Sequence, residues 1–242
     1  MGGWNVKGLT YYDIIVIFIS LKKKSKKGLN KTMQKIFEII IQIVVFLLAI
    51  SVHESAHAYS ADRMGDPTAK HLGRVTLNPI AHIDLIGTII MPLLGIFTGF
   101  VIGWAKPCPV NANNFKDPRR DNMIVSFAGP LSNILLAALS SAIFTILSHF
   151  FTTQSTFAEL FFIYLVYINL LLAFFNLIPI APLDGSWILE GLLPIDLYYS
   201  YQKIRPYSFL ILILLLFTGF LSYILSPIVK LFFHLFTFYW YS

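Results

Sequence analysis

Three ionisable side chains, His53, Glu54 and His57, lie close together in an otherwise apolar stretch of the sequence. The apolar residues around them predict a helix, and positions four apart on a helix lie on one face. His53 and His57 can therefore offer two imidazole nitrogens to one metal ion, with Glu54 beside them. This is the H-E-x-x-H spacing of zinc peptidases. In such sites the ion keeps one position open for water, and the glutamate, which is not a ligand, takes that water's proton.

Coincidence is a poor explanation for this spacing. With 6 His in 242 residues, composition alone predicts about 0.002 such matches in the chain. The competing interpretation is a pair of hydrogen-bonded histidines in a helix bundle without a metal. His71, His82 and Asp84 are further ligand candidates, but loop residues of this kind usually serve only as hydrogen-bonding groups.

The composition predicts a multi-pass membrane protein, because 57% of the residues are hydrophobic, 12% are charged and the mean hydropathy is +0.72. Apolar runs of roughly spanning length occur at 36–60, 123–150, 160–180 and 208–225, with a further run at 228–240. The net charge of +6 comes mainly from loop residues. Membrane insertion accounts for that charge, so nucleic acid is not expected as a partner.

We expect one membrane domain at 33–242, because no soluble stretch is long enough to form a separate core. Residues 1–32 form an extension that is interfacial, disordered or an artefact of the start site. The stretch 85–103 is apolar but interrupted by four glycines and Pro92. Such interruptions favour backbone packed inside protein over a plain spanning helix.

Short strands are expected at 74–77 and at 106–110, where prolines at alternate positions fit an edge strand. The predicted fold is an all-α polytopic membrane protein, a bundle of about five to six transmembrane helices. A re-entrant hairpin and short membrane-associated β-strands are expected near the active site.

The ligand set must come from histidine and carboxylate, because the single cysteine, Cys108, excludes a cysteine-rich zinc site. Asp184 is a candidate third ligand. It stands in backbone unwound by two prolines and is followed by Gly185. Alone, Asp184 could equally cap the following segment, 186–192. Paired with two histidines that lack a third ligand, it favours the metal site.

The proposed site constrains the topology. His53 and Asp184 must meet at one depth, so the helices at 36–60 and 160–180 must cross the membrane in the same direction. The helix at 123–150 supplies one intervening crossing, and 85–103 should therefore enter and leave by the same face. This arrangement gathers nine loop cations on one side, which the basic-residue rule makes cytoplasmic: Arg63, Lys70, Arg74, Lys106, Lys116, Arg119, Arg120, Lys203 and Arg205. We expect a multi-pass protein of the cell membrane with its active site toward the cytoplasmic side; the lysines at 22–27 do not fit this orientation.

The chain resembles the compact prokaryotic branch of the site-2 protease family of intramembrane zinc metalloproteases. The resemblance rests on the motifs at 53–57, 128–133, 176–179 and 182–185, and it covers about residues 33–200. It implies one Zn²⁺ bound by His53, His57 and Asp184, with Glu54 as the general base. It also implies that Asn176 helps to hold the substrate or the developing oxyanion. The implied substrate is a transmembrane or signal-peptide-like segment of a membrane protein, bound within the lipid bilayer as an extended strand along a sheet edge.

Two alternatives come from other classes of protein. A zinc transporter would also use intramembrane histidines and carboxylates, but it should carry further ligands along its helices. An inactive relative would bind transmembrane segments without cutting them, and the intact Glu54 argues against it.

Overall fold

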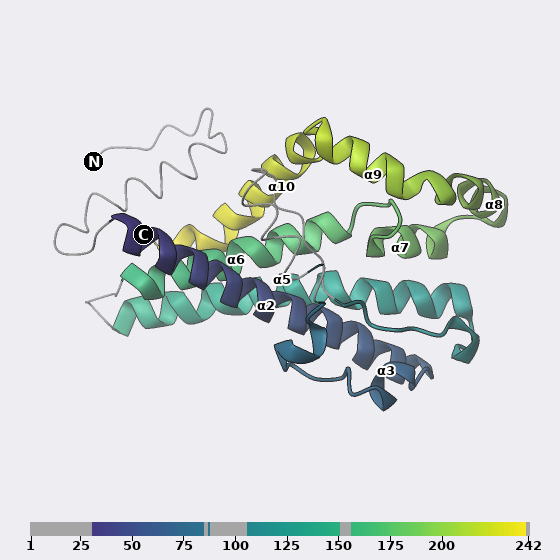
Figure 1. Cartoon of the computed structure of the whole chain (residues 1–242), viewed down its shortest axis with the longest axis horizontal. Coiled ribbons are helices and arrows are strands. Elements are labelled where there is room, and N and C mark those ends of the chain that lie inside the picture. The colour runs from purple at the N-terminus through teal and green to yellow at the C-terminus, as the bar shows by residue number, and fades with distance from the viewer. Residues whose placement is uncertain (1–30, 85–86, 88–105, 151–155, 241–242) are drawn as a thin grey trace.

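The computed structural model describes residues 31–84, 87, 106–150 and 156–240, which form helices joined by turns and irregular loops (Figure 1). The long helices are α2 (Lys31–Met64), α5 (Pro118–Phe150), α6 (Thr156–Asn176) and α10 (Phe220–Thr237). The shorter α-helices are α3 (Thr68–His71), α7 (Asp184–Leu192), α8 (Ile195–Ile204) and α9 (Ser208–Phe217). Single 3-10 turns lie at η1 (Pro79–His82), η3 (Ala112–Asn114), η4 (Arg205–Tyr207) and η5 (Phe238–Trp240). The all-α prediction is confirmed for the described residues.

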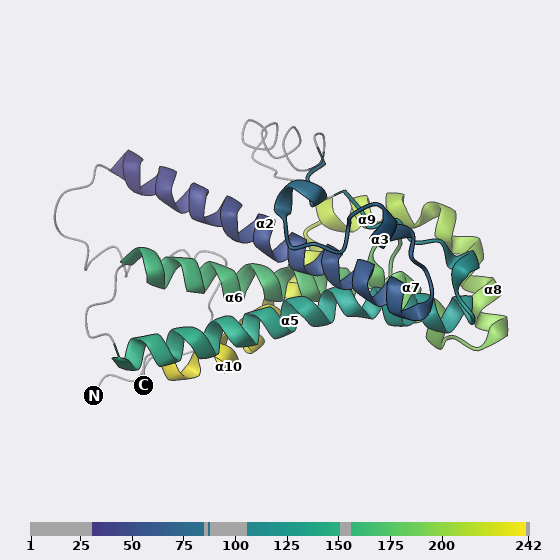
Figure 2. The ribbon, with the colours of Figure 1, turned by 90° about the horizontal axis from the view of Figure 1, so that it is seen from below.

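Helices α2, α5 and α6 form the centre of the bundle. Both views show α2 and α6 running in the same direction and α5 running in the opposite direction (Figures 1 and 2). The predicted parallel course of the two site-bearing helices is therefore confirmed. It brings the C-terminal part of α2 beside the end of α6, where the chain turns into α7.

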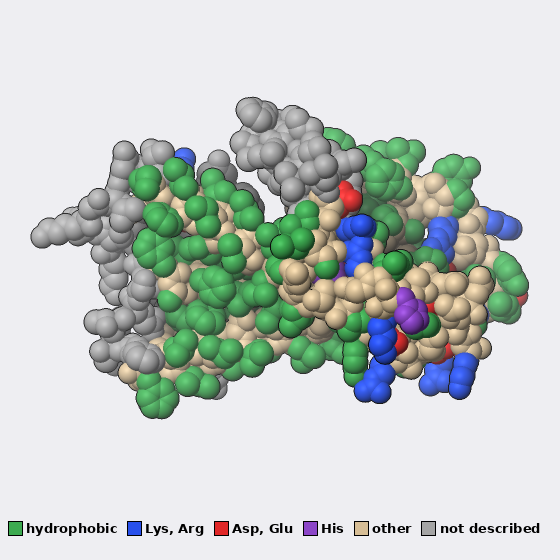
Figure 3. Space-filling model, turned by 60° about the horizontal axis from the view of Figure 1, so that its bottom comes forward, with side chains coloured by type: hydrophobic (Ala, Val, Ile, Leu, Met, Phe, Trp, Pro, Cys, Tyr) green, Lys and Arg blue, Asp and Glu red, His purple; other side chains and the backbone are tan. Residues whose placement is uncertain are grey.

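The long helices have the length and apolar composition of membrane-spanning segments. In the described residues, four helices are long and apolar enough to cross a membrane: α2 from Met33, α5, α6 from Phe157, and α10. This is fewer than the expected five to six. Large apolar side chains point outward from these helices, as on α5, where Leu135 is 60% exposed and Leu139 57% exposed. The space-filling view shows an apolar surface over much of the bundle, with most Lys and Arg side chains of this face near one end (Figure 3).

Two apolar clusters hold the long helices together away from the polar end. One joins Phe144 of α5, Val166 and Leu170 of α6, and Val229 of α10. The other joins Val45 of α2 to Leu160, Tyr164 and Leu165 of α6. Packing in this half is thus almost entirely apolar.

The C-terminal helices differ from the prediction. The expected spans at 208–225 and 228–240 are wrong. One helix ends before Gly219, and the next, α10, continues through Pro227. Gly219 adopts the left-handed conformation with φ +73°. At the end of α9, the N–H of Thr218 donates to the Leu214 carbonyl and the N–H of Gly219 donates to the Leu216 carbonyl. A glycine in this conformation is a common helix stop. Helix α9 has 10 residues and α10 has 18, so α10 alone is long enough to span.

The expected strands at 74–77 and 106–110 are not strands in this structure. The Thr76 carbonyl accepts hydrogen bonds from the Ser55 hydroxyl and from His82 Nε2, the latter at 2.8 Å. The Lys106 N–H donates to the His82 carbonyl at 2.9 Å. Because these groups bond individually to side chains and turns, they form no ladder between strands.

The interior of the predicted hairpin at 85–103 lies outside the described residues, apart from Gly87, and so do residues 1–30 of the predicted N-terminal extension. The two flanks of the hairpin meet, since His82 and Lys106 share a backbone hydrogen bond. The division into an extension and one membrane domain stays a prediction.

Buried Asp66 ties the loop after α2 to the segment before α5. Gly65, with φ +107°, turns the chain out of α2. The Asp66 carboxylate then accepts hydrogen bonds from Thr68, the Asn111 N–H and the Asn114 amide. Burial acts to raise the pKa of Asp66, but these hydrogen bonds outweigh it and leave the pKa below its ordinary value. The loop therefore holds η3 and the start of α5 against the end of α2.

Candidate metal centre

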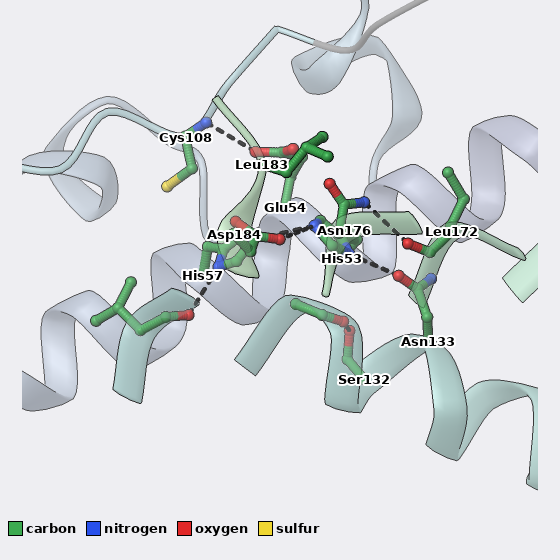
Figure 4. Close-up of polar contacts among 12 residues, drawn as sticks. His53, Glu54, His57, Cys108, Ser132, Asn133, Leu172, Asn176, Leu183 and Asp184 are labelled. Atoms are coloured by element: carbon green, nitrogen blue, oxygen red, sulfur yellow. Dashed lines mark hydrogen bonds and ion pairs between the residues drawn. The ribbon is translucent and has the colours of Figure 1, made fainter. Parts of the chain in front are cut away.

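His53 and His57 project from one face of α2, a turn apart, toward α5 and α7 (Figure 4). Both are 7% exposed. Their rings meet edge to face with centroids 4.6 Å apart, and their Nε2 atoms are 3.0 Å apart. The H-E-x-x-H spacing thus places two imidazole nitrogens side by side, as the sequence predicted.

Asp184 completes a triangle with the two histidines. Its Oδ2 lies 3.1 Å from His53 Nε2 and 3.3 Å from His57 Nε2. Asp184 is the first residue of α7, but the preceding residue, Leu183, is the cap, and no side chain caps this helix. The structure therefore brings Asp184 to the histidines and gives no support to the alternative of a helix cap.

The other ring nitrogen of His53 is fixed by a chain of amide groups. Asn133 of α5 donates its amide to the Ala49 carbonyl at 3.1 Å and to Asn169 Oδ1 at 2.7 Å. Asn169 in turn donates to the Leu165 carbonyl at 2.7 Å. Since carbonyls only accept, Asn133 must turn its oxygen toward His53 Nδ1, which lies 2.5 Å away. His53 Nδ1 therefore carries a proton, and a neutral His53 has its lone pair on Nε2.

His57 is oriented in the same way by the backbone of α5. Its Nδ1 donates to the Val125 carbonyl at 2.7 Å, so a neutral His57 also has its lone pair on Nε2. Two nitrogen lone pairs and one carboxylate oxygen then face one another at 3.0–3.3 Å. A proton could pair only two of these three acceptors, whereas one metal ion pairs all three.

These residues fit zinc. Tetrahedral zinc with nitrogen and oxygen ligands at about 2.0–2.2 Å requires donor atoms about 3.3–3.5 Å apart, close to the triangle seen here. In the described residues, this is the one group of three His, Cys, Asp or Glu side chains that could hold an ion. His71 and Asp84 do not belong to it, and His82 is buried with its Nε2 donating to Thr76.

Gly129 makes room for the two rings. A Cβ at this position of α5 would lie 2.6 Å from His57 Cε1 and 2.7 Å from His53 Cε1, closer than side chains can approach. In the sequence, Gly129 belongs to the 128–133 motif, which by itself does not show what the glycine contacts. The structure adds that the helix approaches the ligands themselves.

Gly185 allows a similar approach on the carboxylate side. A Cβ there would lie 2.5 Å from the carbonyl carbon of Leu177 and closer still to its oxygen. Because Gly185 follows Asp184 directly, this contact sets where the carboxylate emerges from the turn between α6 and α7.

Glu54 lies beside the triangle and does not belong to it (Figure 4). Its Oε2 accepts the backbone N–H of Cys108 at 2.7 Å. Burial, and to a smaller extent the nearby charge of Glu54, raises the pKa of the Cys108 thiol to about 12. The thiol therefore stays neutral, and the backbone is the part of Cys108 that contacts Glu54.

Asn176 is the last residue of α6. Its amide donates to the Leu172 carbonyl one turn earlier, at 3.0 Å. Its predicted role toward substrate stays a prediction. Asn169, seven residues earlier in the same helix, belongs to the buried amide chain instead.

Arginines hold the far end of α7. Arg119 of α5 donates to the carbonyls of Glu190 at 2.7 Å and Leu193 at 2.6 Å. Arg205 pairs with the Glu190 carboxylate at 2.6 Å and lies over the Trp187 ring, 3.7 Å from its centroid. Sequence reasoning counted both arginines only as loop cations. No local pattern indicates that they bind α7.

Comparison with known proteins agrees with this geometry. The profile of peptidase family M50 matches residues 151–219, which include Asp184. The chain is 38% identical to the proposed zinc metalloprotease YwhC of Bacillus subtilis over 193 residues, covering 78% of this chain and 85% of that protein. It is 28% identical to the proposed zinc metalloprotease Rip2 of Mycolicibacterium smegmatis, covering 74% of this chain and 67% of that protein. No solved structure matches significantly.

Proposed function

Because this chain belongs to peptidase family M50, the site-2 protease family, and is a zinc metalloprotease, we propose that it cleaves peptide bonds within membrane-embedded segments of other proteins. The observation that carries this proposal is the triangle of His53, His57 and Asp184 beside Glu54, within apolar helices. A peptide that reaches this site must itself enter the bilayer.

The geometry supports the following roles. His53, His57 and Asp184 would hold the zinc ion. Zinc in such a site makes water nucleophilic near neutral pH and polarises the carbonyl under attack. Glu54 takes the proton of the attacking water on its Oε1 and later gives it to the leaving amine. Its Oε2 is already engaged by Cys108.

Asn176 is proposed to bind the substrate backbone or the developing oxyanion. Its amide would have to exchange the Leu172 carbonyl for the substrate. Such an exchange removes one hydrogen bond from the Leu172 carbonyl, one turn before α6 ends at Asn176.

We also propose that the polar end of the bundle faces the cytoplasm and that 85–103 returns to the face it leaves. The basic residues of the loops support the orientation. The hydrogen bond between His82 and Lys106 supports the return of the chain. The protein would then be a multi-pass protein of the cell membrane with its site toward the cytoplasm.

The competing functions have less support. A transporter needs further ligands along its helices, and the described residues offer one candidate metal group. An inactive relative does not need Glu54, whose carboxylate is held beside the ligands by Cys108.

The test uses purified protein in detergent and co-expression with tagged single-pass substrates. Glu54→Gln should abolish cleavage and leave the zinc content unchanged, because Glu54 acts on the water and not on the ion. Asp184→Ala should lose both cleavage and zinc. Glu38→Gln, in the same helix but away from the site, is the matched control and should behave like the native chain. Equal zinc in the native and Asp184→Ala proteins would remove Asp184 from the site.

A further inference from the structure

The general base has one polar contact that comes from a distant part of the chain. The Cys108 N–H donates to Glu54 Oε2 across 54 residues of sequence. Cys108 lies between Pro107 and Pro109, which have no N–H. Within 106–110, only residues 106, 108 and 110 therefore have a backbone N–H to donate. The N–H of Lys106 donates to the His82 carbonyl, and the N–H of Cys108 donates to the Glu54 carboxylate.

The segment is itself fixed relative to α2. The Lys106 N–H donates to the His82 carbonyl at 2.9 Å. The His82 ring donates to the Thr76 carbonyl at 2.8 Å. That carbonyl also accepts the hydroxyl of Ser55, the neighbour of Glu54. The hydrogen bonds form a closed circuit that leaves α2 at Ser55 and returns to it at Glu54.

Such a circuit matters because Glu54 has three rotatable side-chain bonds. A general base works only when one carboxylate oxygen stays within hydrogen-bond reach of the water it deprotonates. A fixed donor on Oε2 removes most other orientations and leaves Oε1 free. Preorganisation of this kind depends on rigid supporting contacts around the reacting group.

We propose that the backbone N–H of Cys108 is a positioning group for Glu54, held in place through His82, Thr76 and Ser55. This inference rests on the proposed function, in which Glu54 is the catalytic base. The thiol takes no part, so the effect depends on the backbone and not on the identity of the side chain.

Proline at position 108 tests this directly, because it deletes the N–H in a segment already bounded by prolines. Cys108→Pro should lower kcat about 10–100-fold, the usual loss when a supporting contact at a metal site is removed. KM and zinc content should stay within about twofold of native, since neither substrate binding nor the ligands depend on this bond.

Two matched controls separate the N–H from other effects. Cys108→Val removes the thiol and keeps the N–H, so its kcat should equal the native value. Val110→Pro adds the same ring in the same segment, at an N–H that donates to no group within the described residues, and should also leave kcat unchanged. If Cys108→Pro loses zinc, or if Val110→Pro loses as much activity, the segment is merely structural and the inference is wrong.

A second variant keeps the test decisive if Cys108→Pro does not fold. Lys106→Pro releases the anchor on His82 but retains the donor to Glu54. It should lower kcat by a smaller factor with zinc retained, and an unchanged kcat would overturn the inference. The proposed function has a separate readout. If Glu54→Gln cuts as fast as native, the proposed function fails. If Glu54→Gln is dead while Cys108→Pro is fully active, only the inference fails.

Discussion

The two sides of the candidate zinc centre are built differently. The histidine side stands on α2, a helix of 34 residues, and each ring has a second hydrogen bond to α5. The carboxylate side stands at the start of α7, a helix of 9 residues, and Asp184 Oδ2 has no hydrogen-bond donor among the described residues. Hydrogen bonds to α5 therefore orient the two histidine rings. The Asp184 carboxylate is instead oriented by the course of the backbone into α7.

Each side nevertheless combines a glycine contact with polar support from other helices. Gly129 and Asn133 serve the histidines. Gly185 and Arg119 serve the carboxylate, the arginine from the far end of α7. The distance between support and ligand predicts how strongly a change is felt at the metal, and four substitutions test this.

Gly129→Ala should have the largest effect. The added methyl group overlaps both imidazole rings, so the rings must move or α5 must shift, and both ligands leave the triangle. Zinc content should fall more than about tenfold, as expected when ligand geometry is lost. Metal analysis of the purified protein measures it. The control is Ala142→Val, which adds bulk to an exposed position of the same helix. Native zinc content in Gly129→Ala would contradict the close packing described here.

Gly185→Ala should come next, because it displaces one ligand instead of two. The methyl group meets backbone atoms of Leu177 and Ile178, which cannot turn aside as a side chain can. Zinc affinity should fall about tenfold or more while the histidines keep their places. Leu192→Ala, exposed at the other end of α7, is the control. A competition titration with a zinc chelator measures the affinity, and a loss no larger than in the control would show that Gly185 does not set the position of Asp184.

The sequence was sufficient for the parts of this site that depend on helical periodicity. The pair His53 and His57 follows from a spacing of four, and the parallel course of α2 and α6 follows from the need for Asp184 to meet them. The supports were not predictable, because they depend on which helices touch. Nothing local indicates that Arg119 binds carbonyls some 70 residues away or that Asn133 faces His53.

The wrong predictions of spans and strands have the same cause, since they also depend on which segments touch. Composition identified apolar runs, but it could not place the helix break at Gly219 instead of near Pro227. Both residues are potential breaks, and packing decides between them. The strand prediction at 74–77 and 106–110 relied on pattern alone. In the structure, the Thr76 carbonyl and the Cys108 N–H bond to side chains, including Ser55 and Glu54 of α2.

Asn133→Ala should weaken the histidine side without moving the carboxylate. The substitution leaves His53 Nδ1 and Asn169 Oδ1 without their shared partner in a fully buried position. Loss of such a partner usually lowers metal affinity or activity about 10–100-fold. Ser132→Ala is the control, because its hydroxyl bonds only within its own helical turn. We expect the lower end of this range for affinity, since the fixed backbone of α2 still presents His53. An unchanged zinc affinity would show that the amide chain does not orient the ring.

Arg119→Gln should have the smallest effect on zinc, because its contacts lie at the opposite end of α7 from Asp184. The shorter, uncharged side chain loses the bonds to Glu190 and Leu193. Charge-assisted hydrogen bonds contribute about 1.5–3 kcal/mol each. Because Gly185 still fixes the start of α7, their loss mainly destabilises the C-terminal end of this helix. Zinc affinity should fall only about threefold, while amide exchange across α7 rises. Arg120→Gln, the exposed neighbour, should change neither quantity. A loss of zinc affinity larger than in Asn133→Ala would reverse the comparison and make the far end of α7 the main determinant of the carboxylate position.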